Sequence, residues 1–286
     1  RTGQEFSFIQ NKAFKQLISK AVAENQLYFS VANTMNESVC TEAMKFFTES
    51  IVFSREFEDI PGQIRFNYNN NNVLKSMKQY AQRADVGIID MKFDMKNTEI
   101  DVDDTIPENA PPELSRALKS FVSALSDNSQ AKIQRNEIKA RTYHTGVNKK
   151  GELGQYELSL EDESDGTHRL MALAPAIDRV IDNGGIFVAD ELEKGLHPLL
   201  TEYIVNKFQN SEINKNHAQL IFTTHDTEIM RQHFLDADQF YFVDKDRQTG
   251  ESELYSVDGL GKKSNADIRT GYLIGKFGGI PELGDE

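Results

Sequence analysis

The segment Ile186–Glu191 constrains the fold more than any other, because four apolar residues run without interruption into two adjacent carboxylates. A continuous apolar run of this length, after the glycine pair at 184–185, is typical of a buried parallel strand. In open α/β sheets, ligands bind beyond the carboxyl ends of such strands. Two carboxylates at that point suit a metal–nucleotide site, in which one would hold Mg²⁺ and the other would orient water. The alternative interpretation is a buried strand that ends in two solvated acids.

The chain from residue 164 onward alternates between helical and strand patterns. Expected helices cover 167–182, 198–210 and 226–235, and expected strands cover 186–190, 218–223 and 239–243. Such alternation indicates βα units and a parallel sheet with helices against it. We therefore expect an α/β fold.

The first half of the chain has a more helical pattern. Expected helices cover 12–30, 36–50, 72–84 and 112–126, expected strands cover 5–9, 51–53 and 86–89, and a hairpin is expected at 138–147 and 154–161. Pro61-Gly62 has the composition of a turn, and the acidic, proline-bearing stretch 96–113 that of a linker or mobile loop. We expect two lobes, a largely helical insertion with short strands over 1–150 and an α/β lobe over 151–286.

Composition narrows the class of protein. The formal net charge of −13 opposes nucleic-acid binding, so nucleic acid remains a partner only through a local basic patch or another protein. Cys40 is the single cysteine, which excludes a disulfide framework and fits a reducing compartment. With no run of eighteen apolar residues and no secretory leader, we expect a cytoplasmic protein without a membrane partner. Because residue 1 is Arg rather than Met, we also expect the chain to begin partway through a larger protein.

Two further segments carry polar groups at positions that suit phosphate chemistry. Ser164, Asp165, Gly166 and Thr167 open the helix after Glu163, where exposed backbone N–H groups and the positive end of the helix dipole favour an anion. His225 follows an apolar strand and could reach a ligand across the sheet edge. Taken singly, the first is more often an ordinary helix cap, and the second is usually a hydrogen-bonded loop histidine.

In this order, the three segments resemble the ABC-type ATPase heads of the RecF, SMC and OLD group, a class of P-loop NTPase. The similarity is greatest to the prokaryotic AAA-family ATPases of abortive-infection and antiphage systems. Residues 164–167 occupy the place of the signature loop, 186–191 that of Walker B, 193–198 that of the D-loop, and 224–226 that of the switch histidine. The resemblance implies an ABC-like sheet with flanking helices in the second lobe, and a largely helical insertion with a β-hairpin in the first.

The resemblance also implies roles for single residues. Asp190 would bind Mg²⁺ through water, Glu191 would polarise the attacking water, and His225 would contact the γ-phosphate of ATP. The signature loop, Ser164 to Thr167, would bind the γ-phosphate of ATP held by a second ATPase subunit in a homodimer or higher oligomer. The implied function is an ATPase whose ATP-bound dimer switches a partner, with a nuclease as a candidate effector in a defence setting.

The P-loop pattern Gly-x-x-x-x-Gly-Lys-Ser/Thr is absent from the 286 residues. Lys263 and Phe277 stand where a hydroxyl residue would follow the lysine in the two nearest matches. We expect the P-loop to lie upstream of residue 1, and we expect these 286 residues alone to hydrolyse ATP poorly. The alternatives are a degenerate, non-hydrolysing scaffold that binds protein or DNA, and a metal-dependent nuclease that uses Asp190, Glu191 and Glu193.

Overall fold

The computed structural model describes residues 12–57, 59–85, 87–101, 132–246, 248–257 and 265–280, with a few positions between 111 and 121. The chain divides into two compact units. The first combines Arg1–Glu56, Ala176–Lys194 and Pro198–Glu286, and the second combines Phe57–Pro175 with Gly195–His197. The lobe boundary expected at residue 150 stays a prediction.

The first unit contains a three-stranded parallel sheet, in the order β1 (Ile51–Phe53), β5 (Ile186–Ala189), β6 (Gln219–Phe222). Residues 186–188 of β5 pair in register with 51–53 of β1, and residues 186–189 pair with 219–222 of β6. β5 is therefore the central strand, and its Phe187 is fully buried. The carboxyl ends of β5 and β6 lie at one edge of the sheet, as the sequence predicts.

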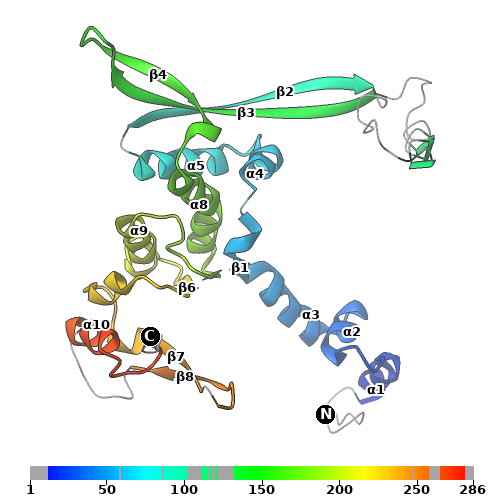
Figure 1. Ribbon diagram of the computed structural model, residues 1–286. Helices are drawn as coiled ribbons and strands as arrows, with labels where there is room; N and C mark the ends of the chain where they lie inside the picture. Colours follow the sequence, from blue (N-terminus) through cyan, green and yellow to red (C-terminus); the bar gives the residue numbers. More distant parts are fainter. Residues whose placement is uncertain are drawn as a thin grey trace. The chain divides into compact units, whose positions relative to one another are not determined.

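The helices of the first unit precede and follow these strands along the chain (Figure 1). They are α1 (Lys12–Ala21), α2 (Tyr28–Thr34), α3 (Ser38–Lys45), the π-helix Phe46–Ser50, α9 (Pro198–Gln209) and α10 (Asn265–Leu273), with 3₁₀ segments at Thr227–Arg231 and Ala237–Gln239. Pro198 is the first residue of α9, where its missing N–H costs no helical hydrogen bond. The mixed α/β fold, with a parallel sheet and flanking helices, is confirmed.

The second unit is an antiparallel meander packed on helices. Its strands are β2 (Ile88–Asp101), β3 (Lys132–Val147) and β4 (Leu153–Ser159), and its helices are α4 (Ile60–Asn67), α5 (Asn71–Ala84) and the first part of α8 (Asp165–Asn183). Near one end of the sheet, α5 lies against β2, and α4 lies against β3 (Figure 1). The core draws on every one of these elements except β4: Ile60, Ile64, Met77, Ala81, Ile88, Met91, Ala140, Met171 and Ala172.

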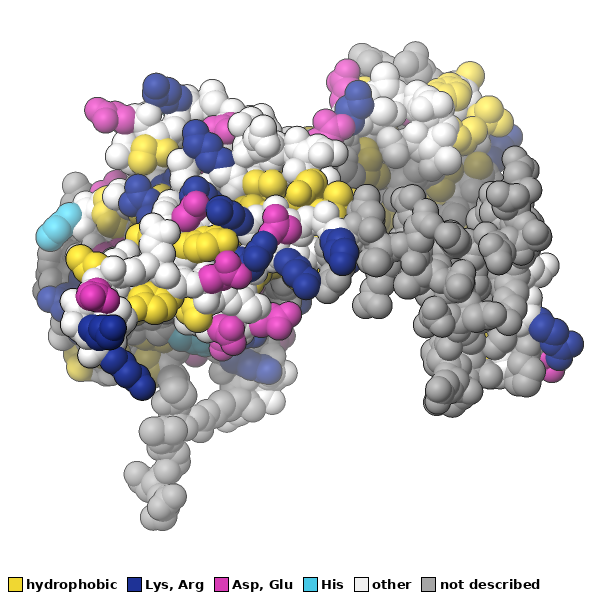
Figure 2. All heavy atoms as spheres, turned by 90° about the horizontal axis from the view of Figure 1, so that it is seen from above, with side chains coloured by type: hydrophobic (Ala, Val, Ile, Leu, Met, Phe, Trp, Pro, Cys, Tyr) yellow, Lys and Arg dark blue, Asp and Glu magenta, His cyan; other side chains and the backbone are white. Residues whose placement is uncertain are grey.

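The outer face of this meander carries paired charges. Arg141 donates hydrogen bonds to Asp94 and, over 3.2 Å, to Glu157, and Lys92 lies 4.9 Å from the ring centre of Tyr143. On the face that Figure 2 shows, basic and acidic side chains are interspersed. Across the described residues of this face, the two signs of charge are therefore mixed.

Several local predictions were wrong. Pro61 and Gly62 lie in the first turn of α4, because Asp59 caps the helix by accepting the Gly62 N–H, and proline is tolerated there. The segment 226–235 is helical only as a 3₁₀ turn over Thr227–Arg231.

The expected third strand exists as β7 (Tyr241–Lys245), but it pairs with β8 (Ser252–Ser256) in a separate antiparallel sheet. Residues 96–101 of the expected linker belong to β2. The expected strand at 5–9, and positions 102–110 of that linker, lie outside the described residues.

Candidate functional site

The edge of the parallel sheet gathers four polar residues from two strand ends. Asp190 and Glu191 follow β5, and Thr223 and His225 follow β6. Backbone bonds fix the two ends to each other, since the Thr223 N–H donates to the Ala189 carbonyl over 3.0 Å and the Leu192 N–H to the Thr223 carbonyl over 3.1 Å. The side chains that follow the strands therefore project from one rigid edge.

Asp190 is held as a charged carboxylate. The Thr223 hydroxyl donates to its Oδ1 over 2.7 Å, and the Arg55 guanidinium donates to its Oδ2 over 2.8 Å. The hydrogen bond from Thr223 and then that from Arg55 hold the pKa of Asp190 below its ordinary value. Because both hydrogen bonds favour the ionised form, Asp190 is an anion at neutral pH.

Arg55 was missed by sequence reasoning. It lies in the 3₁₀ turn Ser54–Phe57, which directly follows β1, and β1 pairs with β5. Both side chains of the Arg55–Asp190 ion pair are more than half exposed, so the pair contributes little to stability. The available signal was an arginine two residues beyond an apolar strand, but only the pairing of β1 with β5 brings it to Asp190.

Glu191 adopts an uncommon backbone conformation. Its φ is +47°, in the left-handed region that residues other than glycine seldom adopt. The Thr223 hydroxyl accepts its N–H over 2.8 Å and so helps to hold the turn. Its Oε1 lies 3.7 Å from His225 Nε2, and the His225 side chain is 86% exposed. The turn thus directs the Glu191 carboxylate toward solvent and the His225 imidazole, whereas the Asp190 carboxylate stays hydrogen-bonded to Thr223.

Glu193 has a different role from its two acidic neighbours. Its Oε1 accepts the His225 N–H over 2.8 Å, which ties the segment after β5 to the segment after β6. Across the described ranges, no three His, Cys, Asp or Glu side chains gather as a set of metal ligands.

The predicted signature loop forms the start of α8 in the second unit. The Ser164 hydroxyl accepts the Thr167 N–H over 3.2 Å and lies 2.9 Å from the Thr167 hydroxyl, so Ser164 caps the helix. Asp165 occupies the first turn, where its charge complements the helix dipole. Thr167 is buried, whereas Ser164 and Asp165 are exposed.

Gly166 packs closely on the backbone of the D-loop region. A Cβ on Gly166 would lie 2.8 Å from the Gly195 carbonyl oxygen, closer than side-chain carbons approach backbone oxygen. Glycine is therefore required at this position for packing. The binding roles assigned to Ser164, Asp165, Gly166, Thr167, Asp190, Glu191 and His225 remain predictions.

The family of the chain follows from comparison with known protein families. Residues 24–231, more than half of the 286, match the model of the family described as "AAA domain, putative AbiEii toxin, Type IV TA system". The chain belongs to this AAA-domain family, which is related to abortive-infection systems and whose general activity is that of a nucleotide-binding ATPase. ATPases of the AAA class use ATP and Mg²⁺. No curated protein matches the chain.

The matched range contains both segments discussed above, the β5–β6 edge with Asp190 and His225 and the start of α8. Among the residues that the structure describes, no helix combines the length and apolarity needed to cross a membrane.

Proposed function

We propose that this chain is part of an ATP-hydrolysing head, with its Mg²⁺ and water-activating groups at the β5–β6 edge. The main observation behind the proposal is that two adjacent carboxylates lie in different environments. Asp190 is hydrogen-bonded and ionised, while Glu191 is turned by its left-handed backbone toward solvent and His225. In P-loop NTPases an acidic residue helps to hold the metal, and a separate residue orients the attacking water.

The residues present fit Mg²⁺ better than a metal held by protein alone. Magnesium keeps several waters and binds through one or two carboxylates together with phosphate oxygens. Both oxygens of Asp190 already accept a hydrogen bond, so Asp190 would meet the ion through water or after Arg55 moves aside. When bound, Mg²⁺ would neutralise charge on the phosphates.

The other residues at this edge would position the reacting groups. Glu191 would accept a hydrogen bond from the attacking water, and His225 would contact the γ-phosphate. The Glu193 carboxylate would keep the His225 backbone in place through the hydrogen bond that it already accepts. Such sites act through positioning and charge stabilisation more than through covalent chemistry.

The signature loop would complete the site of a second subunit. Ser164 is exposed at the start of α8, where the positive end of the helix dipole favours a phosphate. In the proposal, ATP bridges two subunits, and its hydrolysis releases them. The resulting cycle of association would switch an effector, for which a nuclease in a prokaryotic defence system is the candidate class.

Glu191→Gln in the complete protein tests the proposal. The variant keeps the size of the side chain but cannot accept a proton from water, so it is expected to retain ATP and accumulate a closed dimer. Light scattering with ATP and Mg²⁺ would show the doubled mass, and wild type would show it only transiently. A Glu191→Gln protein that stays monomeric with bound ATP would refute ATP-driven dimerisation.

A further inference from the structure

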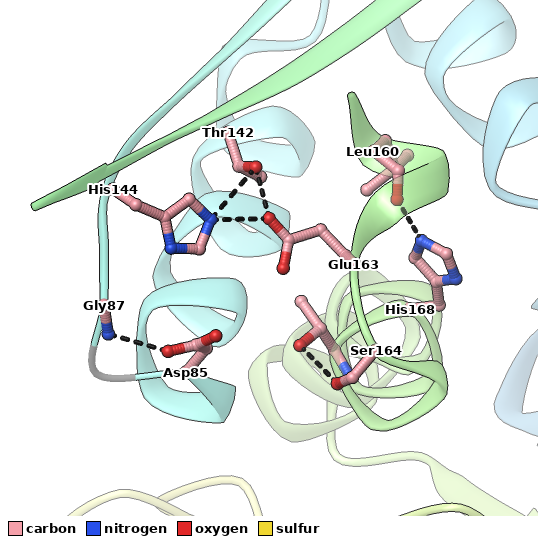
Figure 3. Close-up of polar contacts among 9 residues, drawn as sticks. Asp85, Gly87, Thr142, His144, Leu160, Glu163, Ser164 and His168 are labelled. Carbon is pink, nitrogen blue, oxygen red and sulfur yellow. Dashed lines mark hydrogen bonds and ion pairs between the residues drawn. The ribbon is translucent and has the colours of Figure 1, made fainter. Parts of the chain in front are cut away.

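A buried polar cluster connects strand β3 to the start of α8. The Glu163 carboxylate, whose side chain is only 4% exposed, accepts a hydrogen bond from His144 Nε2 over 2.7 Å and another from the Thr142 hydroxyl. Thr142 is fully buried, and its hydroxyl lies 3.3 Å from His144 Nε2. Figure 3 shows both side chains reaching from β3 toward Glu163, with Ser164 immediately beyond it.

Both contacts to Glu163 in this cluster share one oxygen atom of its carboxylate. Both contacts go to Oε1 of Glu163, and a buried carboxylate without such donors would be strongly unfavourable. The hydrogen bonds therefore fix where the Glu163 side chain lies. They also hold the His144 ring in place, because its Nε2 lies 2.7 Å from Oε1 of Glu163.

Glu163 directly precedes the residue that caps α8. Its own N–H donates to the Leu160 carbonyl over 3.1 Å, and a ring nitrogen of His168 contacts the same carbonyl from the first turn of the helix. Anchoring Glu163 thus sets the path of the chain into Ser164. Farther along α8, Gln63 of α4 donates to the Ala172 carbonyl over 3.1 Å, which fixes the helix at a second point.

Strand β3 is the centre of the meander. It pairs with β2 on one side and with β4 on the other, and Thr142 takes part in both ladders. A displacement of this sheet would move Thr142 and His144 together. Because a packed interior transmits strain, it would also move Glu163 and the loop after it.

We propose that Glu163 is a positioning residue that couples the β2–β3–β4 sheet, through Thr142 and His144, to the signature loop 164–167. This inference rests on the proposed function, since it assigns the loop a role in ATP turnover. Interactions of this kind modulate coupling between sites by about 2- to 30-fold.

Substitutions at Thr142 test the coupling with matched chemistry. Thr142→Val removes the hydroxyl and keeps the shape, whereas Thr142→Ser keeps the hydroxyl. Thr145→Val makes the same change on the same strand at an exposed position, so it serves as the control. Unfolding midpoints of all three variants would identify any that fail to fold.

Two readouts separate positioning from the proposed activity. Hydrogen exchange of the amides at 165–170 reports the order of the loop directly, and it is expected to quicken about 2- to 30-fold in Thr142→Val. In the complete protein, kcat for ATP is expected to fall by a similar factor. The affinity of the monomeric protein for a fluorescent ATP analogue should stay unchanged, because the loop would contact the nucleotide only across the dimer.

The outcomes are distinct. Faster exchange and lower kcat in Thr142→Val, with Thr142→Ser and Thr145→Val close to wild type, would support the coupling. Unchanged exchange in a folded Thr142→Val protein would overturn it, and so would faster exchange with unchanged kcat. A wild-type protein without ATP turnover would overturn the proposed function, and the exchange result would then decide the structural link alone.

Discussion

Gly166→Ala sets two opposing effects against each other at the signature loop. Replacing a helical glycine by alanine normally stabilises a helix by about 0.5–1 kcal/mol, because it reduces the freedom of the unfolded chain. Here the added methyl would lie 2.8 Å from the Gly195 carbonyl oxygen, a backbone atom that cannot rotate away. Overpacking of this kind costs about 1–3 kcal/mol. We therefore expect a net destabilisation of about 1 kcal/mol.

Thermal unfolding and ATP turnover would both report the substitution. A loss of about 1 kcal/mol lowers the unfolding midpoint by about 2–4 °C in a domain of this size, and displacement of the loop should also lower kcat. Gly154→Ala in β4 is the control, because its added methyl would meet only ordinary contacts, the nearest at 3.7 Å. If Gly166→Ala matched Gly154→Ala in stability and kept full turnover, the close packing would not constrain the loop.

The two strand ends offer further tests. Thr223→Val removes the hydrogen bond that most lowers the pKa of Asp190, so the pKa of Asp190 should rise. The acid limb of the pH profile of Mg²⁺-dependent turnover should then move to higher pH. Thr223→Ser keeps the hydroxyl and should keep the wild-type profile. An unmoved limb would show that Asp190 does not govern it. Asn214→Ala removes three hydrogen bonds from a buried side chain and should cost about 3 kcal/mol in chemical unfolding, against about 1 kcal/mol or less for Asn216→Ala, which loses one exposed bond. Equal losses for the two asparagines would contradict the larger cost expected for removing the buried hydrogen bonds of Asn214.

The parallel sheet shows which features of the fold can be predicted from the local sequence pattern. The apolar run that ends in Asp190 and Glu191 predicts both the strand and its position at the ligand edge, since burial on both faces requires uninterrupted apolar residues. The pairing of β1 with β5 cannot be predicted from a local pattern, because more than a hundred residues separate the two strands. Arg55 was missed for that reason.

The polar contacts within the second unit could not be predicted from the sequence either. His144 has no partner at a regular spacing, and the sequence favours a structural role for it. Its contact with Glu163 depends on how β3 packs beside the start of α8, which is a tertiary arrangement. Pro61 shows the converse, because a strong turn signal yields to a helix once Asp59 supplies the cap.

Phosphate release from ATP by the complete protein tests the central claim most directly. With Mg²⁺, wild type and Glu212→Gln, an exposed control, are expected to release phosphate at equal rates. Glu191→Gln is expected to bind ATP at least as tightly as wild type and to lose turnover by orders of magnitude. Release by Glu191→Gln at the wild-type rate would contradict the assignment of the β5–β6 edge as the site of hydrolysis.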